Sequence, residues 1–169
     1  MTILVLSDSH GWKEELKPII ERHRQSVDTI VHAGDSELDQ DAPELEGVQV
    51  VAGNCDYLTS FPNEIELNWK NERILVTHGH LEGVKQSLKS LVIKAKQKGV
   101  STVVYGHTHI AKAEMIDGIL CINPGSVRLP KGNFGGSYCV IEHKTNRVDV
   151  TYFSLAGKRI PELSNYFHL

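Results

Sequence analysis

The chain has 169 residues, of which 40% are hydrophobic and 23% charged, a composition that suits one globular domain with a buried core. Its formal net charge of -3 provides no basic surface for nucleic acid or for an anionic membrane. The apolar runs are no longer than strands, far short of the roughly 20 residues of a membrane span, and the first residues lack the basic region of a signal peptide.

The first half of the chain alternates strand and helix patterns. Short runs rich in Val, Ile and Leu predict strands at residues 2–6, 28–33 and 48–52. Helical spacing predicts a helix at 12–24, in which Pro18 is expected in the first turns or at a bend. Residues 38–45 are expected to form a short helix or a loop. This order favours a parallel or mixed sheet with covering helices.

The second half begins with a hairpin, strands 64–69 and 73–78 around the turn K-N-E, and its clearest helix is predicted at 83–99, ending at Gly99. A strand is expected at 101–105. From residue 111 the pattern is all strands, at 111–116, 119–122, 136–142 and 148–153. We therefore predict an α/β (α+β) fold in one domain, 1–169, with two packed mixed β-sheets (a β-sandwich), helices outside, and a mainly antiparallel second half.

Polar side chains follow five of the predicted strands, at the point where each strand ends. They are Asp8 and His10, Asp35, Asn54, His78 and His80, and His107 and His109. Sites in α/β sheets form beyond the carboxyl ends of the strands, so we expect these side chains to converge there. The D-x-H and H-x-H spacings predict extended segments with both side chains on one side. Imidazole, carboxylate and amide ligands suit a pair of divalent metal ions.

These motifs resemble the calcineurin-like metallophosphoesterases. The family's motifs appear in order as D-S-H at 8–10, G-D at 34–35, G-N at 53–54, His78, and G-H-T-H at 106–109, within a stretch from roughly residue 3 to 128. The short length and I-N-P-G-S at 122–126 resemble the family's compact bacterial and archaeal phosphodiesterase branch. The resemblance implies the four-layer fold of the family, two sheets between helices.

The resemblance also implies a dinuclear metal centre and a bridging hydroxide that attacks phosphorus. Asp8, His10 and His109 would hold one ion, Asn54, His78 and His107 the other, and Asp35 would bridge both. The ligands favour two manganese ions, with iron, nickel, cobalt or zinc as alternatives. We expect a metal-dependent phosphodiesterase acting on a small phosphoester. The alternatives are a phosphomonoesterase or nucleotidase, and a non-catalytic scaffold, because one eukaryotic branch of this fold serves in a membrane-trafficking coat.

Cys55 stands where larger members of that family carry a histidine after G-N. We predict that Cys55 is neither a principal metal ligand nor a nucleophile and is not essential. Protonation of the leaving group then falls to another group, such as His80, which could instead contact substrate phosphate or support a ligand. Arg128 and the backbone amides of 123–128 are candidates for binding an anionic substrate, unless the loop only shapes a turn.

The remaining histidines are predicted to be structural or without a role. His32 is expected to be a hydrogen-bonded core residue, and His23 to pack at the edge of its helix, whereas His143 and His168 receive no role. The three cysteines indicate no disulfide framework and a reducing cytoplasm. A homodimer through an edge strand is the one macromolecular partner that we consider.

Overall fold

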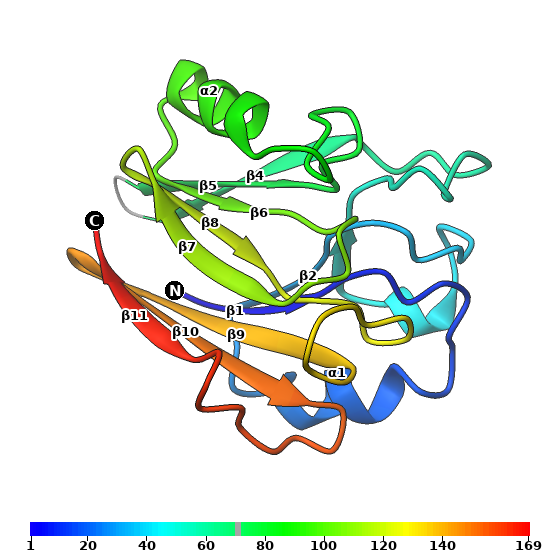
Figure 1. Cartoon of the computed structure of the whole chain (residues 1–169). Coiled ribbons are helices and arrows are strands. Elements are labelled where there is room, and N and C mark those ends of the chain that lie inside the picture. Colours follow the sequence, from blue (N-terminus) through cyan, green and yellow to red (C-terminus); the bar gives the residue numbers. More distant parts are fainter. Residues whose placement is uncertain (70–71) are drawn as a thin grey trace.

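The computed structural model describes residues 1–69 and 72–169, which form two β-sheets packed face to face (Figure 1). The first sheet has the strand order β11-β10-β9-β1-β2-β3, and the second has the order β4-β5-β6-β8-β7. The strands of the first sheet are β1 (Thr2–Leu6), β2 (Thr29–His32), β3 (Val48–Val50), β9 (Ser137–Lys144), β10 (Arg147–Ser154) and β11 (Asn165–His168). Those of the second are β4 (Glu64–Trp69), β5 (Glu72–Thr77), β6 (Thr102–Val104), β7 (Lys112–Ile116) and β8 (Ile119–Asn123).

Both sheets are mixed, as predicted. Strands β1, β2 and β3 run parallel, and so do β5, β6 and β8, whereas β9, β10, β11, β4 and β7 pair antiparallel to their neighbours. The predicted antiparallel pairing of the second half is confirmed for β7 with β8 and for β9 to β11, but these strands do not form one unit. Strands β7 and β8 join the second sheet, whereas β9 to β11 extend the first. Hydrophobic alternation identifies a strand but not its partner, so the sequence pattern could not assign these strands to sheets.

The helices are shorter than the apolar spacing predicts. Helix α1 spans Lys17–His23, with Pro18 in the first turn, where its missing amide costs no hydrogen bond. Helix α2 spans Lys89–Lys98 and ends as predicted at Gly99, whose φ of 64° is left-handed. A short 3-10 helix, η1, covers Pro43–Leu45. Part of the predicted K-N-E turn lies outside the described residues.

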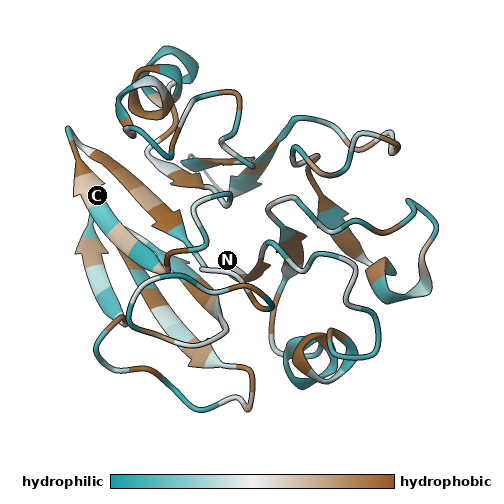
Figure 2. Ribbon diagram, turned by 45° about the vertical axis from the view of Figure 1, so that its right-hand side comes forward, coloured by the Kyte–Doolittle hydropathy of each residue, from teal (hydrophilic) through white to brown (hydrophobic). Residues whose placement is uncertain are grey.

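Strand alternation divides the core into three layers of packing. Ile3 and Val5 of β1 face the second sheet, whereas Leu4 and Leu6 between them pack under α1. In the second sheet, Leu75 packs toward α2 while its neighbours face the first sheet. Helix, sheet, sheet and helix therefore stack as four layers, with apolar strand residues between them (Figures 1 and 2). This arrangement confirms the predicted sandwich.

The strand Asn165–His168 was not predicted. It is β11, an edge strand with mostly exposed side chains that pairs with β10, and its sequence N-Y-F-H lacks a clear apolar alternation. None of the helices in the described part of the chain has the length and apolar character that a membrane span requires.

Candidate metal centre

The polar residues at the strand tips converge into two groups at one edge of the sheets. The ligand atoms of Asp8, His10 and His109 lie within 4.8 Å of one another, and so do those of Asp35, His78 and His107. These side chains follow β1 and β2, a parallel pair in the first sheet, and β5 and β6, a parallel pair in the second. The convergence expected from the sequence is therefore present.

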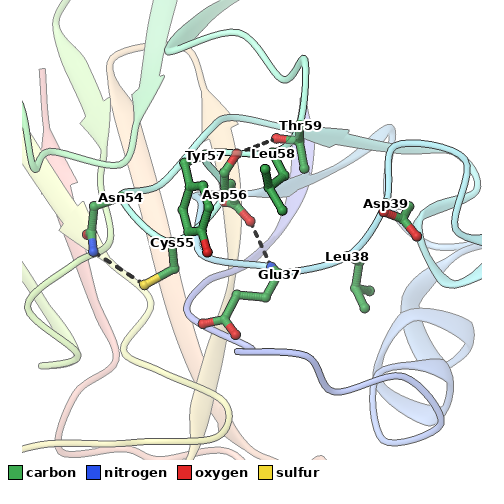
Figure 3. Close-up of a pocket in the computed structure, with 9 residues that line it drawn as sticks. All are labelled: Glu37, Leu38, Asp39, Asn54, Cys55, Asp56, Tyr57, Leu58 and Thr59. Carbon is green, nitrogen blue, oxygen red and sulfur yellow. Dashed lines mark hydrogen bonds between the residues drawn. The ribbon is translucent and has the colours of Figure 1, made fainter.

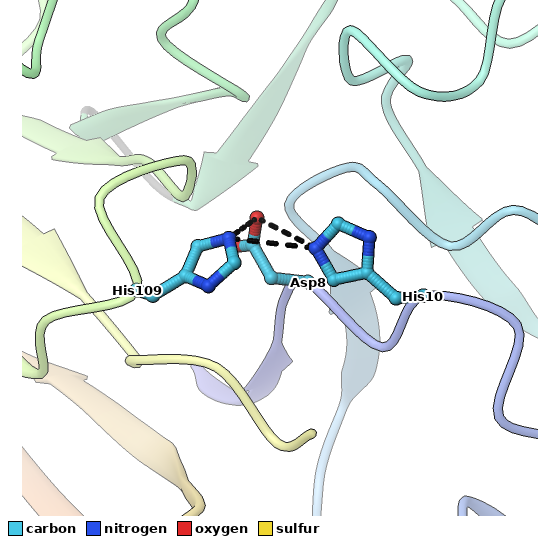
Figure 4. A group of neighbouring side chains, drawn as sticks. All are labelled: Asp8, His10 and His109. Carbon is cyan, nitrogen blue, oxygen red and sulfur yellow. Dashed lines mark hydrogen bonds and ion pairs between the residues drawn. The ribbon is translucent and has the colours of Figure 1, made fainter. Parts of the chain in front are cut away.

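The first group is compact (Figure 4). His109 Nε2 lies 3.1 Å from Asp8 Oδ1 and 3.4 Å from His10 Nε2, and His10 Nε2 lies 4.0 Å from Asp8 Oδ1. The three side chains come from two loops far apart in the sequence, which the fold places opposite each other.

The second group surrounds His78 Nε2. This nitrogen lies 3.4 Å from Asp35 Oδ2, 3.1 Å from His107 Nδ1 and 3.3 Å from Asn54 Oδ1. Asp35 Oδ2 is also 4.0 Å from His10 Nε2 of the first group. The two sets and the intermediate position of Asp35 correspond to the division that the sequence resemblance implies.

In His78 and His109, the Nδ1 atom forms a hydrogen bond to the backbone, which leaves Nε2 free to act as a ligand. His78 Nδ1 donates to the carbonyl of Ala33 and His109 Nδ1 to that of Leu129, both at 2.7 Å. In a neutral ring the other nitrogen then carries a lone pair, and these lone pairs face into the two groups. Asp8 Oδ1 is buried and has no partner in hydrogen-bonding geometry, although His109 Nε2 is close to it. A donor set of this kind fits a divalent cation.

The charges of the centre also favour a cation. Burial opposes charge on His78, but the Asp35 and Asp8 carboxylates outweigh it and raise its pKa, and the contact with Asp8 raises the pKa of His109. Burial, followed by the charge of His78, lowers the pKa of His107 to about 4. Despite burial, the histidines keep the pKa of Asp8 and Asp35 below the usual range. Protons and metal ions therefore compete for this centre.

The backbone at the centre adopts a conformation that the sequence analysis did not predict. Asp8, His10, His107 and His109 have φ values of 54°, 43°, 65° and 63°. These segments are left-handed rather than extended, so the argument from alternating side chains was wrong. His107 and His109 consequently enter different groups. Non-glycine residues in this region are strained and persist where surrounding contacts hold them.

Two glycines permit the close approach of the ligand loops. A Cβ at Gly53 would lie 2.1 Å from Asp35 Oδ1, and one at Gly106 would lie 2.1 Å from Ser7 Oγ and 2.9 Å from Asp8 Oδ2. Any side chain at either position would displace a carboxylate of the centre. Only glycine, which has no Cβ, allows the backbone to come this close at these two positions.

Asp56 supports the centre, and the sequence analysis assigned it no role. Its buried carboxylate accepts hydrogen bonds from the backbone amides of Asp35 and Glu37, both at 2.7 Å, and of Gly53 at 2.9 Å. It also accepts bonds from the amide and hydroxyl of Ser36 at 3.3 and 3.2 Å. Asp56 thereby ties the loop that carries Asp35 to the loop that carries Asn54. Its only sequence signal is its place beside the G-N motif.

Glu37 was also missed. Its Oε1 lies 2.6 Å from His10 Nδ1, so it orients the ring in the same way that the carbonyls orient His78 and His109. Glu37 has a left-handed φ of 54°, and its amide is held by Asp56. The acid two residues after Asp35 was visible in the sequence, but its distance from His10 was not.

Replacing Glu37 with glutamine should weaken metal binding by roughly 10-fold or more, because the His10 ring loses its charged acceptor. The measurement is competition for Mn²⁺ against a chelating dye, without substrate. Glu21→Gln is the matched control, since Glu21 is an exposed partner of Arg24 on α1. Equal affinities for the two variants would show that Glu37 does not support the site.

The loop after β8 is held against the centre by its own polar groups. Ser126 Oγ donates to the carbonyl of Asp8 at 2.7 Å, and the Val127 amide donates to that of Ser7 at 3.3 Å. The Gly125 amide is likewise used, by Asn123 Oδ1 at 2.9 Å. The expectation that these amides meet an anionic substrate is therefore wrong for Gly125 and Val127. The exposed Arg128 donates to the carbonyl of His10, so its guanidinium lies near the centre.

Cys55 lies beside both groups. Its amide donates to Asp35 Oδ1 at 2.7 Å, and its sulfur belongs to a third possible ligand group with His10 and Asp35. Burial and the charges of Asp35 and Glu37 raise the pKa of the Cys55 thiol to about 12. A protonated thiol is a poor nucleophile, which agrees with the predicted absence of covalent chemistry. Its exclusion as a ligand stays a prediction.

His80 lies next to the second group but is not part of it. Its ring centroid is 5.3 Å from that of His78 and 6.1 Å from that of His107, and its Nδ1 is buried without a partner. Burial, followed by the charge of His78, lowers its pKa. His80 therefore carries a neutral ring within reach of whatever the centre binds, and its role stays a prediction.

The histidines predicted to be structural lie apart from the two groups. His32 is buried and pairs with Ser9 Oγ at 2.9 Å, which confirms a core role. His23 pairs with the Tyr138 hydroxyl at 3.0 Å at the edge of α1. His143 of β9 is buried, and its ring contacts that of Trp69 on β4 in the other sheet. His168 lies on β11.

Comparison with known proteins links this centre to one family. The sequence model of the calcineurin-like phosphoesterase superfamily domain matches residues 1–146. The chain is 43% identical over 165 residues to the probable metallophosphoesterase YsnB of Bacillus subtilis, covering 98% of each. It is 39% identical over 106 residues to the phosphodiesterase YfcE of Escherichia coli K12, covering 57% of this chain and 53% of YfcE. A solved structure of an uncharacterised protein from Streptococcus pneumoniae, described as a predicted phosphoesterase, superposes with a TM-score of 0.93 at 32% identity, covering 99% of this chain and 97% of that one.

Proposed function

The chain belongs to the calcineurin-like phosphoesterase superfamily, and from that premise we propose that it is a phosphodiesterase that works with two divalent ions. The observation that carries the proposal is the pair of ligand groups, which together supply seven protein donors around Asp35. Its relative YsnB is named as a probable metallophosphoesterase, and two further relatives, YfcE and MJ0936 of Methanocaldococcus jannaschii, are named as phosphodiesterases.

The proposed ligands follow the two groups. One ion is held by Asp8, His10 and His109, the other by Asn54, His78 and His107, and Asp35 contacts both. Manganese is proposed first, and iron, nickel, cobalt or zinc suit the same donors. When bound, such a pair supplies a hydroxide nucleophile at neutral pH and withdraws charge from the phosphoryl oxygens.

The chain orients each carboxylate so that one oxygen faces the centre. Asp8 Oδ2 accepts hydrogen bonds from Ser7 Oγ at 2.5 Å and from the His107 amide at 3.1 Å, which leaves Oδ1 facing the histidines. The Cys55 amide holds Asp35 Oδ1, which leaves Oδ2 between the two groups. Donors held in this way need no rearrangement when a cation binds, which favours both affinity and rate.

Two side chains are proposed to meet the substrate. His80 lies beside His78, where its ring can contact the phosphoryl group or, in its protonated form, pass a proton to the leaving oxygen and become neutral. Arg128 is proposed to bind a phosphoryl oxygen from the side of His10. Because Cys55 replaces a histidine of larger relatives, we propose a preference for diesters with good leaving groups.

The decisive experiment restores one metal at a time to chelator-treated protein. We expect Mn²⁺ to restore turnover of bis(p-nitrophenyl) phosphate, faster than turnover of p-nitrophenyl phosphate at the same pH. Faster turnover of the monoester, p-nitrophenyl phosphate, would support the phosphomonoesterase alternative. If none of the five metals restores turnover of either substrate, the hypothesis of an enzyme is refuted and the scaffold hypothesis is favoured. A stable protein partner recovered in pull-downs would then support the scaffold.

Cys55→Ser should retain most of the activity, within a few-fold of the unsubstituted protein, because the proposed hydroxide nucleophile makes attack by a thiolate unnecessary. The measurements are kcat/KM on bis(p-nitrophenyl) phosphate and the number of metal ions per chain. A loss of activity comparable with removal of a carboxylate ligand, or loss of one ion, would assign Cys55 a direct role.

We also propose a cellular compartment and an oligomeric state. Three free cysteines, Cys55, Cys121 and Cys139, suit the reducing cytoplasm. A homodimer through an edge strand is proposed as its one macromolecular association, and light scattering at two concentrations tests it.

A further inference from the structure

A pocket of about 430 Å³ adjoins the metal centre, and two residues of its lining, Tyr57 and Leu58, have no part in the proposed chemistry (Figure 3). Asn54, Cys55, Tyr57 and Leu58 are among the residues that line it. Because Asn54 also belongs to the second ligand group, a phosphodiester bound at the centre would direct one of its two ester groups into this pocket.

Tyr57 and Leu58 are unusually exposed for apolar side chains. Their exposed fractions are 81% and 88%, the largest among the exposed hydrophobic side chains of the described residues. Two adjacent large apolar side chains in water mark a contact surface more often than a packing accident. Because they share the lining of this pocket with Asn54, a residue of the second ligand group, we infer that the contact is with the ligand of the centre.

The turn that carries these two residues is held firmly. The Asp56 carboxylate accepts the Gly53 amide at 2.9 Å, and the Asp56 amide donates back to the Gly53 carbonyl at 3.2 Å. On the other side, the Thr59 amide and hydroxyl donate to the Asp56 carbonyl at 3.0 and 2.8 Å. Tyr57 and Leu58 are therefore displayed on a fixed turn, so that binding to them costs little conformational entropy.

The charge of the pocket restricts what it can accept. Glu37 and Asp39 contribute acidic side chains to its lining, and no Lys, Arg or His is among the described residues that line it. An adjoining hollow adds Asp41 and Glu44 and has Lys13 as its single basic residue. A second phosphate or a carboxylate on this side would be repelled.

We propose that this pocket is the subsite for one ester group of the phosphodiester, and that it selects a flat, uncharged aromatic group. The ring of that group packs on the face of Tyr57, with Leu58 beside it, while the phosphate stays at the metal centre. The inference rests on the proposed phosphodiesterase function, which it extends from a reaction to a substrate class, the esters of aromatic alcohols or of nucleoside-like groups.

The test compares inhibitors that share one negative charge and differ in one group. Dimethyl phosphate and methyl phenyl phosphate compete with bis(p-nitrophenyl) phosphate on the Mn²⁺-loaded protein. We expect methyl phenyl phosphate to bind roughly fivefold more tightly, and Tyr57→Ala to remove that difference without changing the affinity for dimethyl phosphate. Tyr166→Ala is the matched control, since Tyr166 is an exposed tyrosine on β11.

A charged analogue tests the selection against acids. Methyl 4-carboxyphenyl phosphate should bind more weakly than methyl phenyl phosphate, and Asp39→Asn should reduce that penalty. Equal affinities of the unsubstituted protein for the methyl and phenyl esters, or no effect of Tyr57→Ala, would overturn the inference and leave the exposed pair to a protein partner. Titration calorimetry measures the affinities for the same phosphate esters without turnover. A protein without activity would therefore refute the proposed function, whereas the measured affinities would still test the subsite.

Discussion

Asp8→Asn should abolish metal-dependent phosphodiester hydrolysis, with kcat/KM falling by at least ~10³-fold, which corresponds to about 4 kcal/mol of transition-state stabilisation. The substitution changes one atom at the critical place. The oxygen of asparagine can still accept from Ser7 Oγ and from the His107 amide, whereas its NH₂ group would face His109 at the position of Oδ1. An amide NH₂ is uncharged and offers no lone pair to a cation.

The measurements for Asp8→Asn are kcat/KM, metal ions per chain and the melting temperature of the metal-free protein. Asp28→Asn is the control, because Asp28 is a carboxylate that accepts the Thr2 amide at 2.7 Å beside the start of β2, whereas the metal centre lies beyond the end of that strand. Activity near that of the control, with metal retained, would contradict the assignment of Asp8 as a ligand.

Asp56→Asn should lower the melting temperature by roughly 10 °C and weaken metal binding in the same protein. The carboxylate accepts five hydrogen bonds from four residues, and asparagine would turn NH₂ toward backbone amides on one side. Hydrogen bonds to a charged group contribute about 1.5–3 kcal/mol each, so a loss of about 3–5 kcal/mol in the free energy of unfolding is expected. In a domain of this size, each kcal/mol shifts the melting temperature by about 2–4 °C.

Asp149→Asn is the control for Asp56, because Asp149 pairs with Lys144 and Arg147 on the surface, where ion pairs contribute about 1 kcal/mol or less. The measurements are calorimetric melting without metal and Mn²⁺ competition at a temperature where both variants are folded. If Asp56→Asn melts together with Asp149→Asn, Asp56 does not hold the two loops. If it melts early but binds Mn²⁺ normally, Asp56 supports the fold and not the centre.

The strands were predictable because their signals are local. The apolar run at residues 2–6 coincides with β1, and the later strands, except the unpredicted β11, fall within a few residues of their predicted ends. The helices were predicted too long, since apolar spacing continues into the turns that precede α1 and α2. Val84 shows the reason: it is buried against Gly79, outside α2, so its place in the apolar stripe reflects tertiary packing and not helical structure.

The candidate centre was predictable at the level of residue types and not of geometry. Side chains after strands were expected to converge, and Asp8, His10, Asp35, His78 and the two histidines after β6 do so. The extended conformation expected for these segments was wrong, since left-handed residues there depend on contacts from distant loops. Glu37 and Asp56 were missed for the same reason. Each forms a hydrogen bond to a residue at least 19 positions away in the sequence, on another loop.

The sequence by itself determined the family, the mixed sheets and the set of candidate metal-binding side chains, because these depend on apolar periodicity and on motifs that lie along the chain. Only the tertiary structure decided which strand joins which sheet, that the ligand segments are left-handed rather than extended, and that Asp56 and Glu37 hold the centre. These features arise where segments distant in sequence meet and satisfy each other's backbone and side-chain polar groups. That pairing depends on the whole fold, and no local stretch of sequence contains it.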